Sequence, residues 1–152
     1  MQLPLETQDI PDAASGPHTL LVEDDCAYAR IVQYTLRKTQ PGQSVHHVSD
    51  GAQALDYVFG RGGYADRDKF PMPGVIILDL RMPRMDGFEV LRELKSNPAT
   101  RAITIVVMTS SDLTSDRQRC HEYGADRFVT KPTHIAELSE NLSSIYASRH
   151  GA

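Results

Sequence analysis

The sequence lacks the features that mark a membrane protein or a secreted protein. None of its apolar stretches approaches the roughly 20 residues needed to span a bilayer, and residues 1–18 lack a basic start followed by an apolar core. Only two cysteines are present, Cys26 and Cys120, and neither belongs to a CxxC pair. We therefore expect a cytoplasmic protein whose two thiols stay reduced.

Several binding motifs are missing as well. The six histidines include no HExxH pair, and the glycine-bearing stretch 60–73 lacks the GK[ST] ending of a P-loop. The adjacent His46 and His47 are expected to be one exposed and one packed side chain rather than metal ligands. The net charge of −4 argues against nucleic acid as a partner, because proteins that bind nucleic acid usually present a basic face.

What remains is the composition of one ordinary globular domain. The chain has 152 residues, of which 40% are hydrophobic and 24% charged, enough to bury a substantial core. Residues 1–17 mix proline, serine, glycine and acids without periodicity and are expected to form a flexible arm. The domain itself is expected over 18–148, followed by a short tail at 149–152.

Five short apolar runs alternate with five segments of helical periodicity. The runs, expected as strands, lie at 18–23, 44–49, 74–80, 102–108 and 126–130. The helical patterns lie at 28–36, 50–59, 87–96, 112–124 and 133–149. The last of them places an apolar stripe on one side, made of Ile135, Leu138, Leu142, Ile145 and Tyr146. Strands buried on both faces and joined by helices are parallel, so we predict an α/β three-layer sandwich with a five-stranded parallel sheet.

Polar residues stand where four of these strands end. Glu23 and Asp24 end the first strand, Asp79 ends the third, Thr109 ends the fourth and Lys131 ends the fifth. The carboxyl ends of parallel strands meet at one edge of the sheet, so these side chains are expected to converge. Three neighbouring carboxylates repel one another unless a cation neutralises them, and an all-oxygen cluster suits Mg²⁺ or Mn²⁺.

Such a group is suited to phosphoryl transfer. An Asp79 oxygen can act as the nucleophile, while Lys131 and Thr109 offset the charge on the other phosphoryl oxygens. The metal would bridge the carboxylate and the phosphoryl group.

Four segments, "LVEDD", "IILDLRMPRMDGFEVL", "VVMTSS" and "GADRFVTKP", together resemble the receiver domain of two-component response regulators. The resemblance covers roughly residues 18–148 and implies the flavodoxin-like (βα)5 fold. It makes Asp79 the phosphoacceptor and gives the metal site four contributors: Glu23, Asp24, Asp79 and the backbone carbonyl of Arg81.

The resemblance also assigns the residues that respond to the phosphoryl group. Thr109 takes the place of the switch hydroxyl, Phe128 that of the switch aromatic and Lys131 that of the phosphate-binding lysine. The peptide bond between this lysine and the next residue, Pro132, is usually cis in the family. Arg81 and Ser111, two places beyond Asp79 and Thr109, are expected to flank the path of hydrolytic water and so to tune the phosphoryl lifetime.

The implied function is that of a single-domain regulator. It would accept a phosphoryl group from the phosphohistidine of a sensor histidine kinase and change the face formed by 112–124, 126–130 and the last helix. The long loop at 60–73 and the N-terminal arm are similar to those of stand-alone regulators that partner bacterial phytochrome kinases. We expect a homodimer through this face, using Asp116, Arg117, Arg119, Glu122, Asp126, Arg127, Tyr123 and Tyr146.

Other interpretations of these residues exist. Glu23 and Asp24 could simply favour the dipole of the following helix, Thr109 could cap a helix, and Phe128 could be a core aromatic. The chain could be a receiver-like interaction module that is never phosphorylated. The chain could also be a phosphatase of the haloacid dehalogenase type, but such an enzyme needs a second acid where Arg81 stands.

Overall fold

The computed structural model describes residues 17–150, with side chains through residue 147. The expected N-terminal arm thus lies outside the described residues except for Pro17. Its flexibility, and the domain boundaries at 18 and 148, stay predictions.

Five parallel strands form one sheet in the order β2-β1-β3-β4-β5. They are β1 (His18–Val22), β2 (Ser44–Val48), β3 (Val75–Leu78), β4 (Thr104–Thr109) and β5 (Arg127–Thr130). The central β3 is buried throughout, which accounts for its unbroken apolar sequence VIIL. Because chain order reverses between β1 and β3, the carboxyl ends of these two strands border the crevice where parallel sheets place their functional groups.

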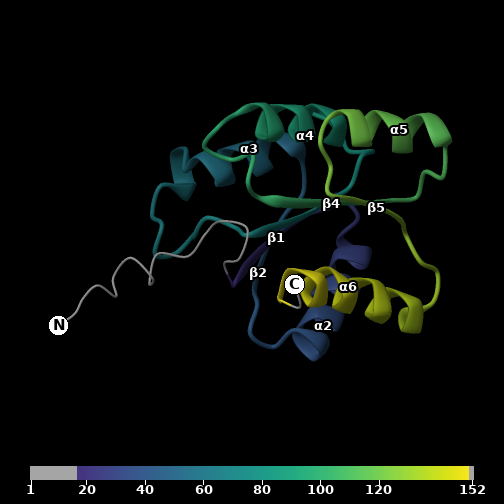
Figure 1. Ribbon diagram of the computed structural model, residues 1–152. Helices are drawn as coiled ribbons and strands as arrows, with labels where there is room; N and C mark the ends of the chain where they lie inside the picture. Colours follow the sequence, from purple (N-terminus) through teal and green to yellow (C-terminus); the bar gives the residue numbers. More distant parts are fainter. Residues whose placement is uncertain (1–16, 151–152) are drawn as a thin grey trace.

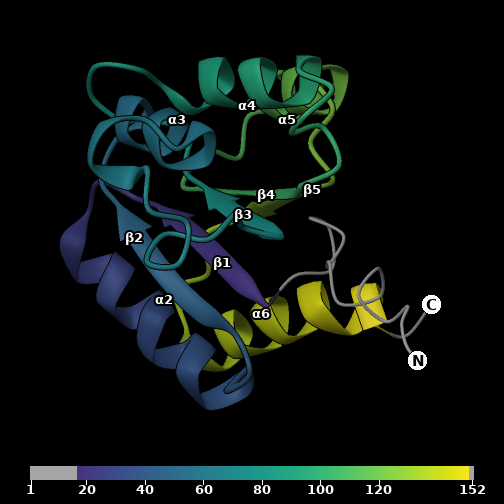
Figure 2. The ribbon, with the colours of Figure 1, turned by 90° about the vertical axis from the view of Figure 1, so that its left-hand side faces the viewer.

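Helices cover both faces of the sheet, as predicted (Figure 1). On one face lie α3 (Gly51–Phe59), α4 (Gly87–Ser96) and α5 (Thr114–Glu122). On the other lie α2 (Cys26–Thr39) and α6 (Ile135–His150), and the turned view in Figure 2 shows the same three layers. No helix within 17–150 is both long and apolar enough to cross a membrane.

Short polar side chains set where the helices begin. Asp50 accepts a hydrogen bond from the backbone N–H of Gln53 and caps α3. Asp25, directly after the acidic pair, accepts from the N–H groups of Ala27 and Tyr28 and caps α2. The polypeptide therefore turns into a helix immediately after the acidic pair, which keeps the pair at the edge of the sheet.

The core has one apolar cluster on each side of the sheet. The predicted stripe of α6 is buried at Leu138, Leu142, Ile145 and Tyr146, but Ile135 is 58% exposed. This first residue of α6 borders a shallow pocket with Tyr28 and Ile31 of α2, so the stripe is open to solvent at this end. Both cysteines are free, as expected.

The long segment between α3 and β3 is ordered against α3. It contains a short 3₁₀ helix (Gly62–Tyr64), and the guanidinium of Arg67 donates to the carbonyls of Tyr57 and Val58 in the last turn of α3. The Tyr57 carbonyl also accepts from the backbone N–H of Gly60 at 3.2 Å, so the arginine adds hydrogen bonds to carbonyls at the C-terminal end of α3.

Candidate functional site

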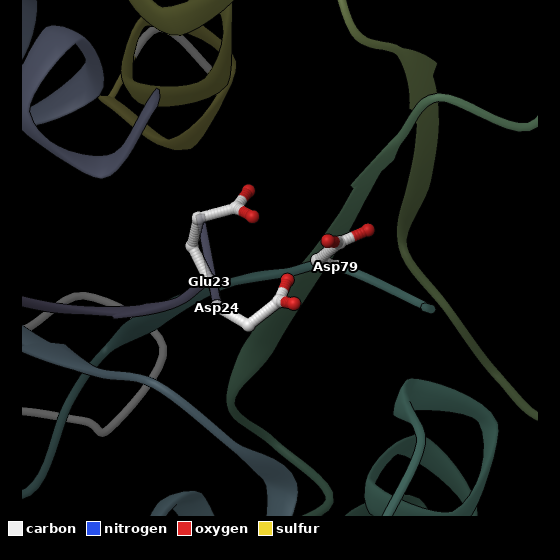
Figure 3. Close-up of side chains that lie close together, drawn as sticks. All are labelled: Glu23, Asp24 and Asp79. Carbon is white, nitrogen blue, oxygen red and sulfur yellow. The ribbon is translucent and has the colours of Figure 1, made fainter. Parts of the chain in front are cut away.

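Three carboxylates meet at the carboxyl edge of the sheet. Glu23 and Asp24 directly follow β1, and Asp79 directly follows β3. One oxygen from each side chain lies within 4.8 Å of the others, and Figure 3 shows the Asp24 carboxylate turned toward Asp79. Glu23 and Asp79 are buried, whereas Asp24 is exposed, so the cluster is open to solvent on one side. Clustered carboxylate oxygens of this kind fit a hard divalent cation such as Mg²⁺.

Lys131 enters the same cluster from the end of β5. Its ammonium lies 2.8 Å from Glu23 Oε1 and 3.4 Å from Asp79 Oδ2. It also lies 4.7 Å from the ring centre of Tyr28, which shields it from water on another side. The lysine is thus already beside the oxygen atoms to which a phosphoryl group would be attached.

Burial controls the titration of this cluster. It raises the pKa of Glu23 to about 7, although the Lys131 ammonium opposes the rise, and the Asp79 charge adds to it. Burial alone would lower the pKa of Lys131, but its hydrogen bond to Glu23 and the charge of Asp79 outweigh burial and raise it. Lys131 is therefore the permanent cation of the site. Glu23 is the carboxylate whose ionised form a second cation would stabilise most.

The predicted switch residues flank this group. Thr109 is fully buried at the end of β4, and its carbonyl accepts from the backbone N–H of Lys131 at 2.7 Å. Phe128 is half-buried on β5, beneath the Arg117 guanidinium, which lies 4.6 Å from the centre of its ring. Phe128 therefore packs against the core cluster and also contacts Arg117 of α5 with its ring.

The side chain of Arg81 lies across the gap between two loops. Its guanidinium pairs with Asp116 of α5 at 2.7 Å, and the Ser111 hydroxyl donates to the same carboxylate oxygen at 2.5 Å. The backbone N–H of Arg81 lies 3.4 Å from Asp79 Oδ1. Sequence reasoning placed Arg81 and Ser111 beside the site but missed Asp116, which joins them.

The loop after β3 is anchored on its other side too. The guanidinium of Arg84 pairs with the buried Asp50, the cap of α3, and Arg84 itself has a φ of 67°. A Cβ on Gly87 would lie 2.3 Å from the carbonyl oxygen of Asp79, so no larger residue fits there. This close approach explains the glycine at this position.

His47 contacts the site from β2, the one strand that was expected to contribute nothing. Its Nε2 lies 2.7 Å from the backbone carbonyl of Glu23. A carbonyl only accepts, so Nε2 carries the proton and the ring holds the backbone at the acidic pair. His46 instead packs against the rings of Tyr57 and Phe70, so both histidines are half-buried and the expectation of one exposed ring was wrong.

The comparison with known families decides the identity of the fold and site. The model of the response regulator receiver domain matches residues 19–143. The chain belongs to this family. Response regulator Rcp1 of Synechocystis is 33% identical over 126 residues, which are 83% of this chain and 84% of that protein.

Solved structures of receivers agree. The phosphorylated cyanobacterial phytochrome response regulator RcpA has a TM-score of 0.81 and 31% identity, covering 90% of this chain and 96% of the other. RPA3017, a response regulator in red light signalling of R. palustris, has a TM-score of 0.80 and 30% identity, with 87% and 92% covered. The predicted resemblance to phytochrome-associated regulators is therefore confirmed.

Three details of this receiver differ from expectation. No peptide bond within the described residues is cis, so the bond from Lys131 to Pro132 is trans. Asp116 and Tyr146, predicted for a dimer surface, are only 7% and 1% exposed. Both turn inward because they have polar partners there: Arg81 for Asp116, and the hydroxyl of Thr19, 2.7 Å away, for Tyr146.

Proposed function

We propose that this receiver accepts a phosphoryl group on Asp79 from the phosphohistidine of a sensor histidine kinase. The observation that carries the proposal is the convergence of Glu23, Asp24 and Asp79 within 4.8 Å, with the Lys131 ammonium 3.4 Å from Asp79. A structural ion pair would need one acid and one base. Three acids and one base leave a deficit of positive charge that suits a metal ion and a phosphoryl group together.

The reaction is a simple displacement. An Asp79 oxygen forms a bond to phosphorus while the bond from phosphorus to the histidine nitrogen breaks, and the imidazole leaves with the electron pair. Lys131 stays charged throughout and donates to phosphoryl oxygens as it now donates to Asp79. Later attack by water returns the free carboxylate and releases inorganic phosphate.

Glu23, Asp24, Asp79 and the backbone carbonyl of Arg81 are the proposed ligands of Mg²⁺ or Mn²⁺. An ion held by these oxygens would neutralise charge that develops between the carboxylate and the phosphoryl oxygens. All four contributors offer oxygen, which matches the preference of these ions.

The response to phosphorylation would run through Thr109 and Phe128. The Thr109 hydroxyl is drawn toward a phosphoryl oxygen, and Phe128 moves into the space that it leaves. Because the Arg117 guanidinium covers the Phe128 ring, this movement changes the surface that α5 and β5 share.

A first experiment separates this function from the two alternatives. The purified chain, incubated with acetyl phosphate and Mg²⁺, should gain the mass of one phosphoryl group. A chain that gains no mass would be an interaction module that is never phosphorylated. Multiple turnover of small phosphate esters would instead indicate a phosphatase, which we do not expect because Arg81 replaces the acid that such an enzyme needs.

The kinase is proposed to be of the bacterial phytochrome class. The support is the similarity to RcpA, a cyanobacterial phytochrome response regulator, and to RPA3017, a response regulator in red light signalling. A phosphotransfer panel against the sensor kinases of the same cell tests it. The phytochrome kinase should label this chain fastest, and preferential labelling by another kinase would refute the assignment.

We also propose a homodimer through α5, β5 and α6. A groove of about 410 Å³ lies between α5 and β5, and its lining mixes both charges around Phe128, including Arg117, Asp126 and Arg127. Charges of both signs can pair across a two-fold axis, but exposed pairs contribute only about 0–1 kcal/mol each. With Tyr146 buried, the apolar contribution has to come from residues such as Tyr123 and Leu113, which is 55% exposed. Sedimentation of both phosphorylation states decides this, and a monomer in both would remove the proposal.

A further inference from the structure

Asp116 is an acid in an unusual position, because its carboxylate is nearly buried although its helix lies at the surface. Its side chain is 10% exposed, while that of its partner Arg81 is 59% exposed. Arg81 is the only cation within ion-pair distance of this carboxylate among the residues that the structure describes. Breaking the pair would leave a charge without compensation in a place that water barely reaches, so the closed arrangement is strongly favoured.

The two groups that Asp116 holds come from the two loops that flank the phosphoacceptor. Arg81 stands two residues after Asp79, and Ser111 stands two residues after Thr109, whose hydroxyl oxygen accepts from the Ser111 N–H at 3.4 Å. β3 and β4 are neighbours in the sheet. The chain of contacts from Arg81 through Asp116 to Ser111 therefore connects the ends of these two strands beside Asp79.

This arrangement affects hydrolysis of an acyl phosphate. Water must form its bond to phosphorus opposite the Asp79 oxygen that leaves, and residues 81 and 111 are the expected neighbours of that path. The Arg81 guanidinium and the Ser111 hydroxyl are both engaged with Asp116. In this state the long side chain of Arg81 is held across the gap, and the Ser111 hydroxyl donates its proton to Asp116 rather than to a water molecule.

We propose that Asp116 is a positioning residue that lengthens the life of the acyl phosphate by fixing Arg81 and Ser111. The inference rests on the proposed phosphorylation of Asp79. It assigns a role in that chemistry to an acid on α5 that does not touch the reacting atoms.

The test follows the intact mass of the full chain after labelling with acetyl phosphate and Mg²⁺ and removal of the reagent. Asp116→Asn keeps the size of the side chain but removes its charge, so Arg81 is released. The phosphoryl group should be lost about fivefold faster, which corresponds to a barrier lowered by roughly 1 kcal/mol. Arg81→Asn should also shorten the lifetime, and the double variant should decay no faster than Arg81→Asn alone.

Asp112→Asn is the matched control. Asp112 is exposed in the loop that contains Ser111 and has no hydrogen bond or ion pair to the other described residues. Its substitution therefore removes one negative charge without releasing Arg81. Its lifetime should equal that of the wild type. Asp116→Glu, which keeps the charge, is the second variant to use if Asp116→Asn folds poorly. Its phosphoryl lifetime should lie between those of Asp116→Asn and the wild type.

Four results would overturn the proposal. An unchanged lifetime in Asp116→Asn, or effects of the two single variants that multiply in the double variant, would show that the residues do not act together. An equal slowing of labelling and shortening of lifetime would show a general disturbance of the site. A wild-type chain that gains no mass would remove the proposed function, and this inference with it.

Discussion

The Lys131 ammonium lies 3.4 Å from Asp79 Oδ2, on a side chain that starts from a different strand end. The same ammonium is 2.8 Å from Glu23, so one cation is shared by two buried carboxylates. The sharing leaves the site short of positive charge before any ligand is bound. Most of the predictions below follow from that shortage.

Lys131→Ala should destabilise the protein as well as impair its response. Glu23 and Asp79, which are 2% and 5% exposed, would lose the cation that contacts both of them. Breaking a buried pair in this way should lower the free energy of unfolding by about 3 kcal/mol. Urea denaturation in the presence of chelator is the measurement. Lys38→Ala, which removes an exposed cation from α2, is the control. Equal stabilities of the two variants would show that the central cation contributes nothing to the fold.

Removal of metal should stop phosphorylation of the wild-type chain. Excess chelator leaves the charge between the Asp79 oxygen and the phosphoryl oxygens uncompensated, and Mg²⁺ or Mn²⁺ should restore the reaction. Mass gain from acetyl phosphate is the measurement. Asp24→Asn, which alters the exposed member of the cluster, should require a higher Mg²⁺ concentration for the same rate. Undiminished labelling in chelator would contradict the metal site.

Gly87→Ala should disturb the phosphoacceptor through the backbone. The new methyl group would lie 2.3 Å from the Asp79 carbonyl oxygen and 2.8 Å from the Leu80 Cα, and neither backbone atom can rotate away. We expect a loss of about 1–3 kcal/mol in stability and slower labelling. Gly42→Ala is the control, because a Cβ there meets nothing within 4 Å. Normal labelling in Gly87→Ala would show that the loop after β3 adapts freely.

Histidine burial predicts a loss of stability in acid. Burial lowers the pKa of His46 below its ordinary value of 6.5, and the nearby His18 adds to the effect. The unfolded chain therefore takes up the proton first, so the contribution of neutral His46 is present above pH 6.5 and is lost as the pH falls through the lowered pKa.

His46→Gln should accordingly lose less stability than the wild type between about pH 7.5 and about pH 5. Thermal unfolding across that range is the measurement. His121→Gln, at an exposed histidine on α5, should behave like the wild type. Parallel pH profiles for His46→Gln and the wild type would contradict the buried role of this ring.

The strands, the helices and the central site were predictable because each depends on local pattern and on strand order. A short run of branched apolar residues such as 75–78 indicates a buried strand, and parallel strands carry their final residues to one edge of the sheet. Glu23, Asp79 and Lys131 were found in this way. The contact of His47 with Glu23 was missed because a half-buried β2 leaves its side chains no distinctive pattern.

The pairs formed by Arg81 with Asp116 and by Arg84 with Asp50 were not predictable. Each joins a loop to a helix distant in the sequence, and the burial of the two acids depends on how closely those elements pack. From the sequence, Asp116 is only one of several charges on the predicted dimer face. Tyr146 was misplaced for a related reason, since its hydroxyl finds Thr19 across 127 positions of the chain.

Asp79 is the proposed phosphoacceptor. Asp79→Asn keeps nearly the same shape but replaces the nucleophilic carboxylate, so the variant should fold normally and should be at least as stable as the wild type without metal. The most direct measurement is the intact mass of both proteins after acetyl phosphate and Mg²⁺, with peptide mapping of the labelled residue. We expect one phosphoryl group on residue 79 of the wild type and none on the variant, whereas equal labelling of Asp79→Asn, or a label elsewhere in the wild type, would contradict the account.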